Sequence, residues 1–204
     1  YLSHGSTYAP FNIENPLFVF VGSSVNAVRT DQGRKVSDVV DILLFFESFI
    51  SNTTGATANI ERILSGHTGF LDRERREIFS NAFPYLTEEG MTGDALYKDM
   101  VRVVFNCPTI GATLHVERLR GISGEIRLRL GENEPFGVIN VGDDSALLAL
   151  CRDNGLTTDV IDFSDSLFQG IVKPESSINV LIGSKKFTEG WNCWRVSTMG
   201  LMNV

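Results

Sequence analysis

One stretch near the end of the chain gathers most of the side chains that could hold a ligand. An apolar run at 178–182 passes into a polar segment, which is the pattern of a buried parallel strand that delivers a loop at its carboxyl end. Open α/β sheets bind ligands at such loops. A second apolar run follows at 196–201. The loop between them carries hydroxyl, ammonium, carboxylate, amide and indole groups on Ser184, Lys185, Lys186, Thr188, Glu189, Trp191, Asn192 and Trp194, together with Gly190.

Familiar catalytic patterns are missing from the sequence. It contains neither a G-x-x-x-x-G-K-[ST] phosphate loop nor a D-E-x-H magnesium motif, and VGSSV at 21–25 is not the G-x-S-x-G elbow of a serine hydrolase. The three histidines, His4, His67 and His115, stand apart from one another, and we assign them no chemistry. The three cysteines are odd in number and lack C-x-x-C spacing, so we expect reduced cytosolic thiols rather than disulfides or a zinc site.

Buried strands and capped helices are predicted to position the loop. LFVFV at 17–21 reads as a buried strand that ends in a loop with Ser23 and Ser24. Ser37 and Asp38 start a helix that is apolar nearly all round, so we expect it to be packed on both sides. Strands at 136–141 and 159–163, with a helix between them, and a short turn or helix at 164–168 precede the strand at 178. This alternation predicts an α/β fold with a parallel sheet covered by helices.

Residues 51–135 have a different character. We expect short helices at 59–65, at 71–83 and from Thr92 onward, followed by a period-two hairpin between 112 and 130 with one wet face. The hairpin arginines then form either a solvated strand face or a basic ribbon that tracks a nucleic-acid backbone: Arg118, Arg120, Arg127 and Arg129. The predicted organisation is therefore a first strand and helix in 1–50, an insertion in 51–135, and the remainder of the domain in 136–204.

The segment GSKKFTEGWNCWRVS resembles a conserved element of superfamily 2 helicases and translocases. In the second RecA-like domain of that family a Thr follows a strand, a Gly stands six residues later, and an Asp two residues beyond. Ser184, Gly190 and Asn192 occupy that spacing here. The segment is most similar to the restriction subunits of type III restriction enzymes and related DEAD/DEAH-box proteins, and the resemblance covers the last third of the chain. LFVFVGSS resembles the first strand of the same domain, with 136–141 as the competing candidate.

The resemblance implies contacts with a nucleic-acid backbone from two loops. Ser184 would meet a phosphate through its hydroxyl or its backbone, supported by the positive charges of Lys185 and Lys186. Ser23 and Ser24 would touch the same backbone from the loop after the first strand. The implied partner is DNA, although the sequence does not distinguish DNA from RNA.

The resemblance also implies half of a nucleotide cleft. Gly190 would allow close backbone approach, Asn192 would face the ribose of ATP, and Glu189 would lie beside them. The family has Asp where this chain has Asn192, and an amide still forms hydrogen bonds but brings no charge. ATP and Mg²⁺ are the implied cofactors of the intact protein, and a first RecA-like domain of the same polypeptide and a modification or specificity subunit are the implied partners.

Phosphoryl transfer needs a phosphate cradle, a metal ion and a charge-stabilising arginine together. The first two motifs are absent, and the family's arginine-rich element would lie beyond Val204. We therefore expect this chain alone not to hydrolyse ATP and to be a fragment of a longer polypeptide.

Composition sets the remaining bounds. The 204 residues carry a net charge of −7, so any nucleic-acid contact must be local rather than drawn by a global basic field. No signal peptide or membrane-spanning segment is visible, and we expect a cytoplasmic protein. For Trp191 and Trp194 we favour core or interface packing over base stacking. The alternative function is a non-catalytic interaction module in which residues 51–106 and the hairpin dock a partner protein.

Overall fold

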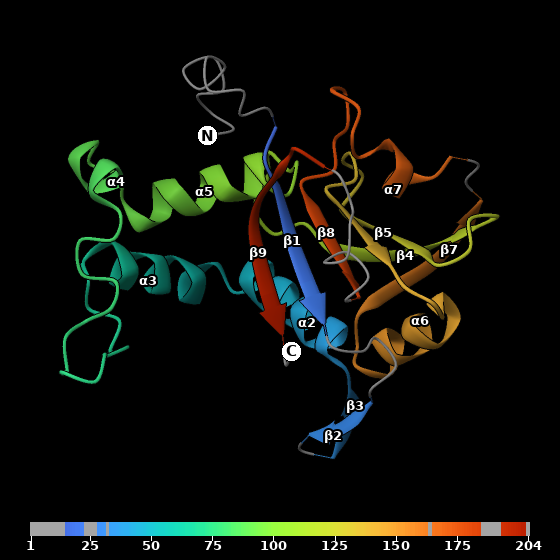
Figure 1. Ribbon diagram of the computed structural model, residues 1–204, viewed down its shortest axis with the longest axis horizontal. Coiled ribbons are helices and arrows are strands. Elements are labelled where there is room, and N and C mark those ends of the chain that lie inside the picture. The colour runs from blue at the N-terminus through green and yellow to red at the C-terminus, as the bar shows by residue number, and fades with distance from the viewer. Residues whose placement is uncertain (1–14, 23–27, 32, 163–164, 185–192, 203–204) are drawn as a thin grey trace.

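A mostly parallel sheet forms the centre of an α/β architecture (Figure 1). The computed structural model describes residues 15–22, 28–31, 33–162, 165–184 and 193–202. The seven strands lie in the order β7-β4-β5-β6-β8-β1-β9. Strand β5 is antiparallel to both neighbours, and the other neighbouring pairs are parallel. The strands are β1 (Leu17–Gly22), β4 (Leu114–Arg120), β5 (Glu125–Leu130), β6 (Gly137–Asn140), β7 (Thr157–Asp162), β8 (Val180–Ser184) and β9 (Val196–Met202). The predicted α/β class is thus confirmed, with a sheet of the kind that RecA-like domains have.

Helices lie on both sides of this sheet. On one face α2 and α6 pack against the strands, and the pair α3 and α5 extends beyond β9 in Figure 1. The opposite face carries the short helix α7. The helices are α2 (Asp38–Ser51), α3 (Thr53–Leu64), α4 (Pro84–Glu88), α5 (Gly93–Val103), α6 (Asp144–Asp153) and α7 (Leu167–Gly170). None of the helices in the described ranges has the length and apolar character needed to cross a bilayer.

Local capping explains where the two sheet-covering helices begin. The Ser37 hydroxyl accepts a hydrogen bond from the amide of Val40, and the acidic first turn of α2 complements the helix dipole. The Asp143 carboxylate caps α6 in the same way by accepting from the amide of Ala146. The start of α2 agrees with the sequence prediction. The expectation that α2 is packed on both sides is wrong, because Phe45 lies exposed on its outer side.

The larger core lies between the sheet and the helices. Phe46 of α2 meets Phe20, Phe105 and Phe136 edge to face, with ring centroids 5.6–6.3 Å apart. The hydroxyl of the fully buried Tyr97 donates to the carbonyl of Ile50 at 3.0 Å, which ties α5 to the end of α2. Aromatic packing therefore joins the helical pair to the sheet.

A smaller apolar cluster covers the opposite face of β1, β6 and β8. It contains Leu17, Val19, Val21, Val138, Ile171, Ile178 and Leu181. Beside it the buried Arg195 donates to three main-chain carbonyls, those of Asn15, Ile171 and Ile178, each at 2.6 Å. One side chain thus joins the segments that lead into β1, β8 and β9.

Several segments differ from the sequence prediction. Residues 71–83 form turns and an isolated bridge between Leu71 and Glu77 instead of a helix, because the Glu77 carboxylate accepts from the amides of Thr68 and Gly69. The hydrogen bond from the Thr68 hydroxyl, followed by those from these amides, lowers the pKa of Glu77.

A small hairpin of β2 (Arg29–Asp31) and β3 (Arg34–Val36) was not expected, although Gly33 at a φ of 82° supplies its turn. The predicted hairpin at 112–130 is confirmed as β4 and β5, and its strands lie inside the central sheet. The division of the chain into a domain and an insertion at 51–135 remains a prediction.

Candidate ligand site at the carboxyl edge of the sheet

The two predicted binding loops start at neighbouring positions. Strands β1 and β8 are parallel and pair in register, so that Gly22 lies directly beside Ser184. On the other side of β8, Asn140 of β6 pairs with Gly183. Strands β1, β6 and β8 therefore all end at one edge of the sheet, the carboxyl edge, where parallel sheets hold their ligands.

Burial explains why the register of β1 and β8 is fixed. Leu17, Val19 and Val21 point into the smaller cluster, while Val180 and Ile182 point into the larger core. A shift of either strand by one residue would move these side chains to the wrong face. The relative position of Gly22 and Ser184 is thus set by the apolar residues of both strands.

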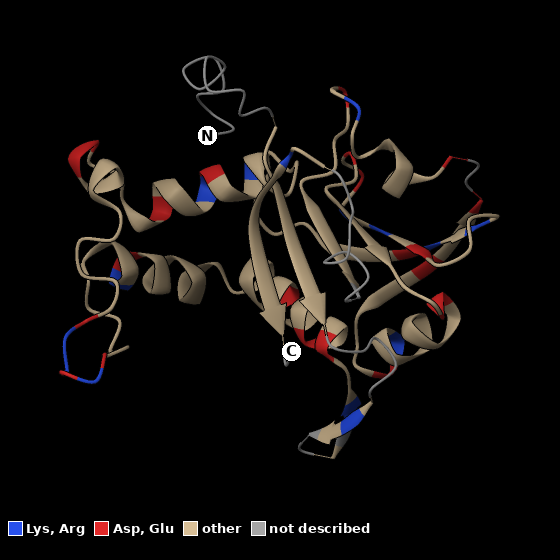
Figure 2. Cartoon of the chain, viewed as in Figure 1, with Lys and Arg blue, Asp and Glu red and all other residues tan. Residues whose placement is uncertain are grey.

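The start of α2 lies directly against the end of β1. A Cβ atom on Gly22 would stand 3.3 Å from the Cβ of the buried Asp38, so a larger residue would crowd the helix. Arg29 of β2 forms ion pairs with Asp38, at 2.9 Å, and with Asp41. Asp38 and Asp41 lie in the first turn of α2, and Figure 2 shows acidic positions in red on this helix, near the ends of β1 and β9. Carboxylates already occupy this helix N-terminus, which disfavours a phosphate group there.

A second acidic position lies at the start of α6. Asp144 accepts from the guanidinium of Arg118 at 2.8 Å and from the amide of Gly124 at 2.9 Å. Burial alone would raise the pKa of Asp144, but these hydrogen bonds outweigh it and hold the pKa below its ordinary value. The Asp144 carboxylate therefore joins the β4–β5 turn to the start of α6.

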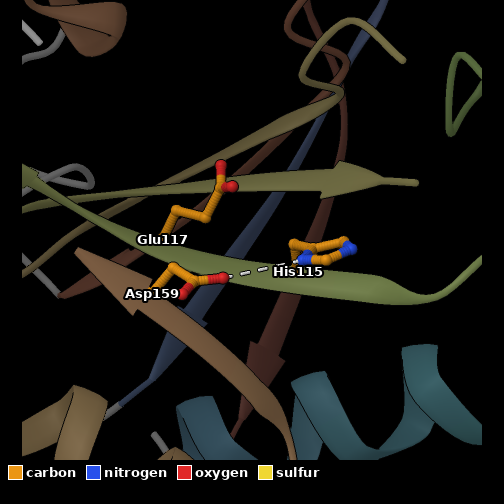
Figure 3. A group of neighbouring side chains, drawn as sticks. All are labelled: His115, Glu117 and Asp159. Atoms are coloured by element: carbon orange, nitrogen blue, oxygen red, sulfur yellow. Dashed lines mark ion pairs between the residues drawn. The ribbon is translucent and has the colours of Figure 1, made fainter. Parts of the chain in front are cut away.

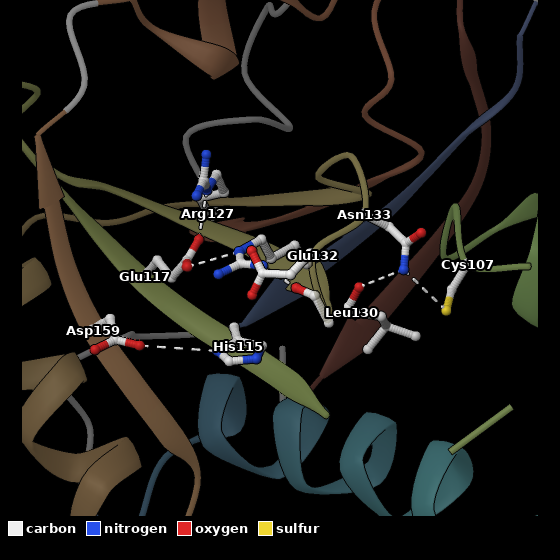
Figure 4. Close-up of polar contacts among 10 residues, drawn as sticks. Cys107, His115, Glu117, Arg127, Leu130, Glu132, Asn133 and Asp159 are labelled. Carbon is white, nitrogen blue, oxygen red and sulfur yellow. Dashed lines mark hydrogen bonds and ion pairs between the residues drawn. The ribbon is translucent and has the colours of Figure 1, made fainter. Parts of the chain in front are cut away.

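The polar face of the hairpin is neither a wet face nor a basic ribbon. Glu117 is only 1% exposed, and its two oxygens accept from Arg127 at 2.6 Å and from Arg129 at 2.8 Å (Figure 4). Arg120 is paired with Asp162 at 3.0 Å. Alternating polarity in the sequence was recognised, but it does not reveal that Glu117 and Arg127 pair across the strands. The predicted solvated face is corrected accordingly.

His115 is less isolated than the sequence indicated. It shares a sheet face with Glu117, and Asp159 of the neighbouring strand β7 brings a carboxylate 3.9 Å from its Nδ1 atom (Figure 3). The i, i+2 spacing of His115 and Glu117 was visible in the sequence. The pairing of β4 with β7 was not, because the two strands are far apart along the chain.

The loop residues predicted to bind a ligand fall mostly outside the described residues: Ser23, Ser24, Lys185, Lys186, Glu189, Gly190 and Asn192. Ser184 is placed as the last residue of β8. Trp191 also falls outside. Trp194 is 92% exposed, so it does not pack in the core of this chain, and the interface alternative stays a prediction.

Comparisons of this chain with protein-family models, with curated proteins and with solved structures found no match.

Proposed function

We propose that this chain is part of the second RecA-like domain of an ATP-dependent DNA translocase of the kind found in type III restriction enzymes. The observation that supports it most directly is the register of Gly22 with Ser184. The two loops that the resemblance assigns to the nucleic-acid backbone leave neighbouring parallel strands at one edge. A single phosphate backbone can therefore contact both.

In this proposal, the DNA contact is confined to those two loops. The chain is acidic overall, and Asp38 and Asp41 stand at the same edge, where they repel phosphate groups. Arg29 neutralises part of that charge. Lys185 and Lys186, with the hydroxyls of the loops, supply the local attraction that binding requires.

The nucleotide is held between two domains in the proposed mechanism. Glu189, Gly190 and Asn192 form one wall of the cleft, and a first RecA-like domain of the same polypeptide supplies the phosphate cradle and the ligands of Mg²⁺. ATP supplies the energy for domain closure, while this chain orients the ribose and contacts the DNA backbone. A modification or specificity subunit is the further proposed partner.

Salt-dependent DNA binding tests the proposal. Fluorescence anisotropy with a labelled duplex compares the wild-type chain with the double variant Ser184→Ala and Lys185→Ala across a salt series. Each lost phosphate contact reduces the slope of log K against log salt by about 0.9. Lys98→Ala, which removes an exposed lysine on α5, is the matched control and leaves the slope unchanged. Equal slopes for the double variant and the wild type would refute the phosphate contact. A duplex RNA of the same sequence separates DNA from RNA binding.

A second candidate function is a protein-interaction module, and one observation favours it. Large apolar side chains are exposed along residues 70–85, in the turns between α3 and α4 and at the start of α4: Phe70, Leu71, Ile78, Phe83 and Tyr85. Exposed apolar side chains that gather in one region mark interaction sites in many proteins. If the chain shows no DNA binding even at low salt, this function is favoured over the translocase domain.

A further inference from the structure

Three side chains with metal-binding atoms converge on β4 and the edge strand β7. They are His115, Glu117 and Asp159, and one potential ligand atom from each lies within 4.8 Å of the others (Figure 3). His115 and Glu117 share one face of β4, and Asp159 is the register partner of Glu117. The group lies in the sheet itself, apart from the loops at the carboxyl edge.

The Nδ1 atom of His115 is a buried polar atom with no hydrogen-bond partner among the described residues. An unpaired buried nitrogen is costly, so native structures rarely retain one. A carboxylate oxygen of Asp159 lies 3.9 Å from this nitrogen, which is too long for a hydrogen bond. Two ligands of one tetrahedral metal ion stand about 3.4 Å apart, given bonds of about 2.1 Å. The spacing of this pair is thus nearer to that of shared ligands than to that of a hydrogen bond.

We propose that His115, Glu117 and Asp159 bind a divalent transition-metal ion of the Zn²⁺ or Mn²⁺ class. Imidazole favours zinc and its neighbours over Mg²⁺ and Ca²⁺, and carboxylates complete the set. Asp159 is 58% exposed in its side chain and gives the ion access from solvent. The exposed Asp159 side chain also has the freedom to move about 1 Å towards the other two ligands, as a shared ion requires.

The two arginines beside Glu117 are the main electrostatic objection to a cation. Arg127 and Arg129 each donate one bond to Glu117, but a carboxylate has about four lone-pair sites, so sites remain for a metal ion. Arg129 also pairs with Glu132 at 3.1 Å (Figure 4). The negative charges of Glu117, Asp159 and Glu132 outnumber the two guanidinium charges. The arginines then orient Glu117, as hydrogen-bonded partners of metal ligands commonly do.

An ion at this position would link the edge strand β7 to β4. Among the strands that the structure describes, β7 pairs only with β4, and its side chains are exposed or partly exposed. The ion would thus join His115 and Glu117 of β4 to Asp159 on an exposed edge strand of the sheet.

Calorimetric titration of the purified chain with Zn²⁺ tests the site. The wild type is expected to bind one ion, and Asp159→Asn and His115→Gln to weaken that binding at least tenfold, since loss of a ligand exceeds the effect of losing an outer partner. Asp162→Asn is the matched control, because Asp162 lies on the same strand and is more exposed. It is expected to bind as tightly as the wild type.

Absence of a one-to-one Zn²⁺ complex in the wild type would overturn the proposal. So would equal affinity of the wild type and Asp159→Asn, which would assign the ion to other donors such as the thiol of Cys193. Circular dichroism establishes that each variant is folded. If His115→Gln fails to fold, the exposed Asp159→Asn decides the outcome alone.

Discussion

Replacing Arg195 with methionine tests how the second face of the sheet is held together. The guanidinium is buried, and its three recorded bonds go to the main-chain carbonyls of Asn15, Ile171 and Ile178. Burial lowers the pKa of Arg195, which reflects the cost of keeping a cation out of water. Methionine retains most of the apolar stem and removes the charge and all three bonds.

The size of the effect follows from two opposing terms. Hydrogen bonds to a charged group contribute about 1.5–3 kcal/mol each, whereas burying an ion without an opposite charge costs several kcal/mol. Ile171 and Ile178 are almost fully buried, so water cannot replace the lost donors at their carbonyls. Each unsatisfied carbonyl costs about 1–3 kcal/mol. Asn15 is partly exposed, so its carbonyl can be hydrated. We expect a net loss of about 2–4 kcal/mol in the free energy of unfolding.

Urea denaturation followed by circular dichroism measures this loss. A change of about 3 kcal/mol corresponds to a fall in Tm of roughly 6–12 °C for a chain of this size. Arg120→Met, at an exposed surface ion pair, is the control and is expected to change stability by less than about 0.5 kcal/mol. Arg195→Lys should lose less stability than Arg195→Met but more than the control Arg120→Met. If Arg195→Met unfolds at the same urea concentration as the wild type, the proposed role of the three carbonyl contacts is wrong.

Three further predictions concern single groups. The pKa of Asp144 is lowered in the folded state, so this carboxylate stabilises the fold above about pH 4, and that stabilisation is lost as the pH falls through the folded pKa. In Asp144→Asn the free energy of unfolding should therefore fall less steeply with decreasing pH in the acid range, and an unchanged dependence would contradict this. Gly124→Ala should lower the free energy of unfolding, measured in urea, by at least about 2 kcal/mol. Gly124 has a φ of +81°, and an added Cβ would clash with the carbonyl oxygen of Val141. Unchanged stability of this variant would show that the turn adapts. Burial raises the pKa of Cys151 to about 12, so its thiol should react with a disulfide reagent at pH 8 only after unfolding, and rapid native labelling would argue against its burial.

Local patterns in the sequence were enough to predict the sheet's central strands. The runs that became β1, β6 and β8 are apolar on both faces, and the alternation that became β4 and β5 has a clear period of two. Ser37 indicated the start of α2 for the same reason, since a cap acts within one turn of the helix.

Two of the misses, the helix predicted at 71–83 and the solvated face of the hairpin, depend on contacts between residues whose proximity the sequence does not show. The apolar and charged spacing of 71–83 suits a helix, yet one carboxylate, Glu77, stabilises a turn by accepting from two amides. The pairing of Glu117 with two arginines and its proximity to His115 and Asp159 both require knowledge of strand order. Of the predicted ligand-binding residues, only Ser184 lies within the described part of the chain. The register of Gly22 with Ser184 is consequently the main structural support for the proposed loops.

The position of β1 has a consequence for how the chain folds. Its two partners, β8 and β9, lie at 180–184 and 196–202, so β1 is synthesised well before either of them and cannot pair until they have been made. Until then the LFVFVG segment has two open edges and an apolar surface, which is the composition of aggregation-prone strands. Such distant pairing also slows folding, because a long loop must close before any contact is gained. We therefore expect the chain to refold slowly, and we expect its β1 segment to need chaperone protection during synthesis.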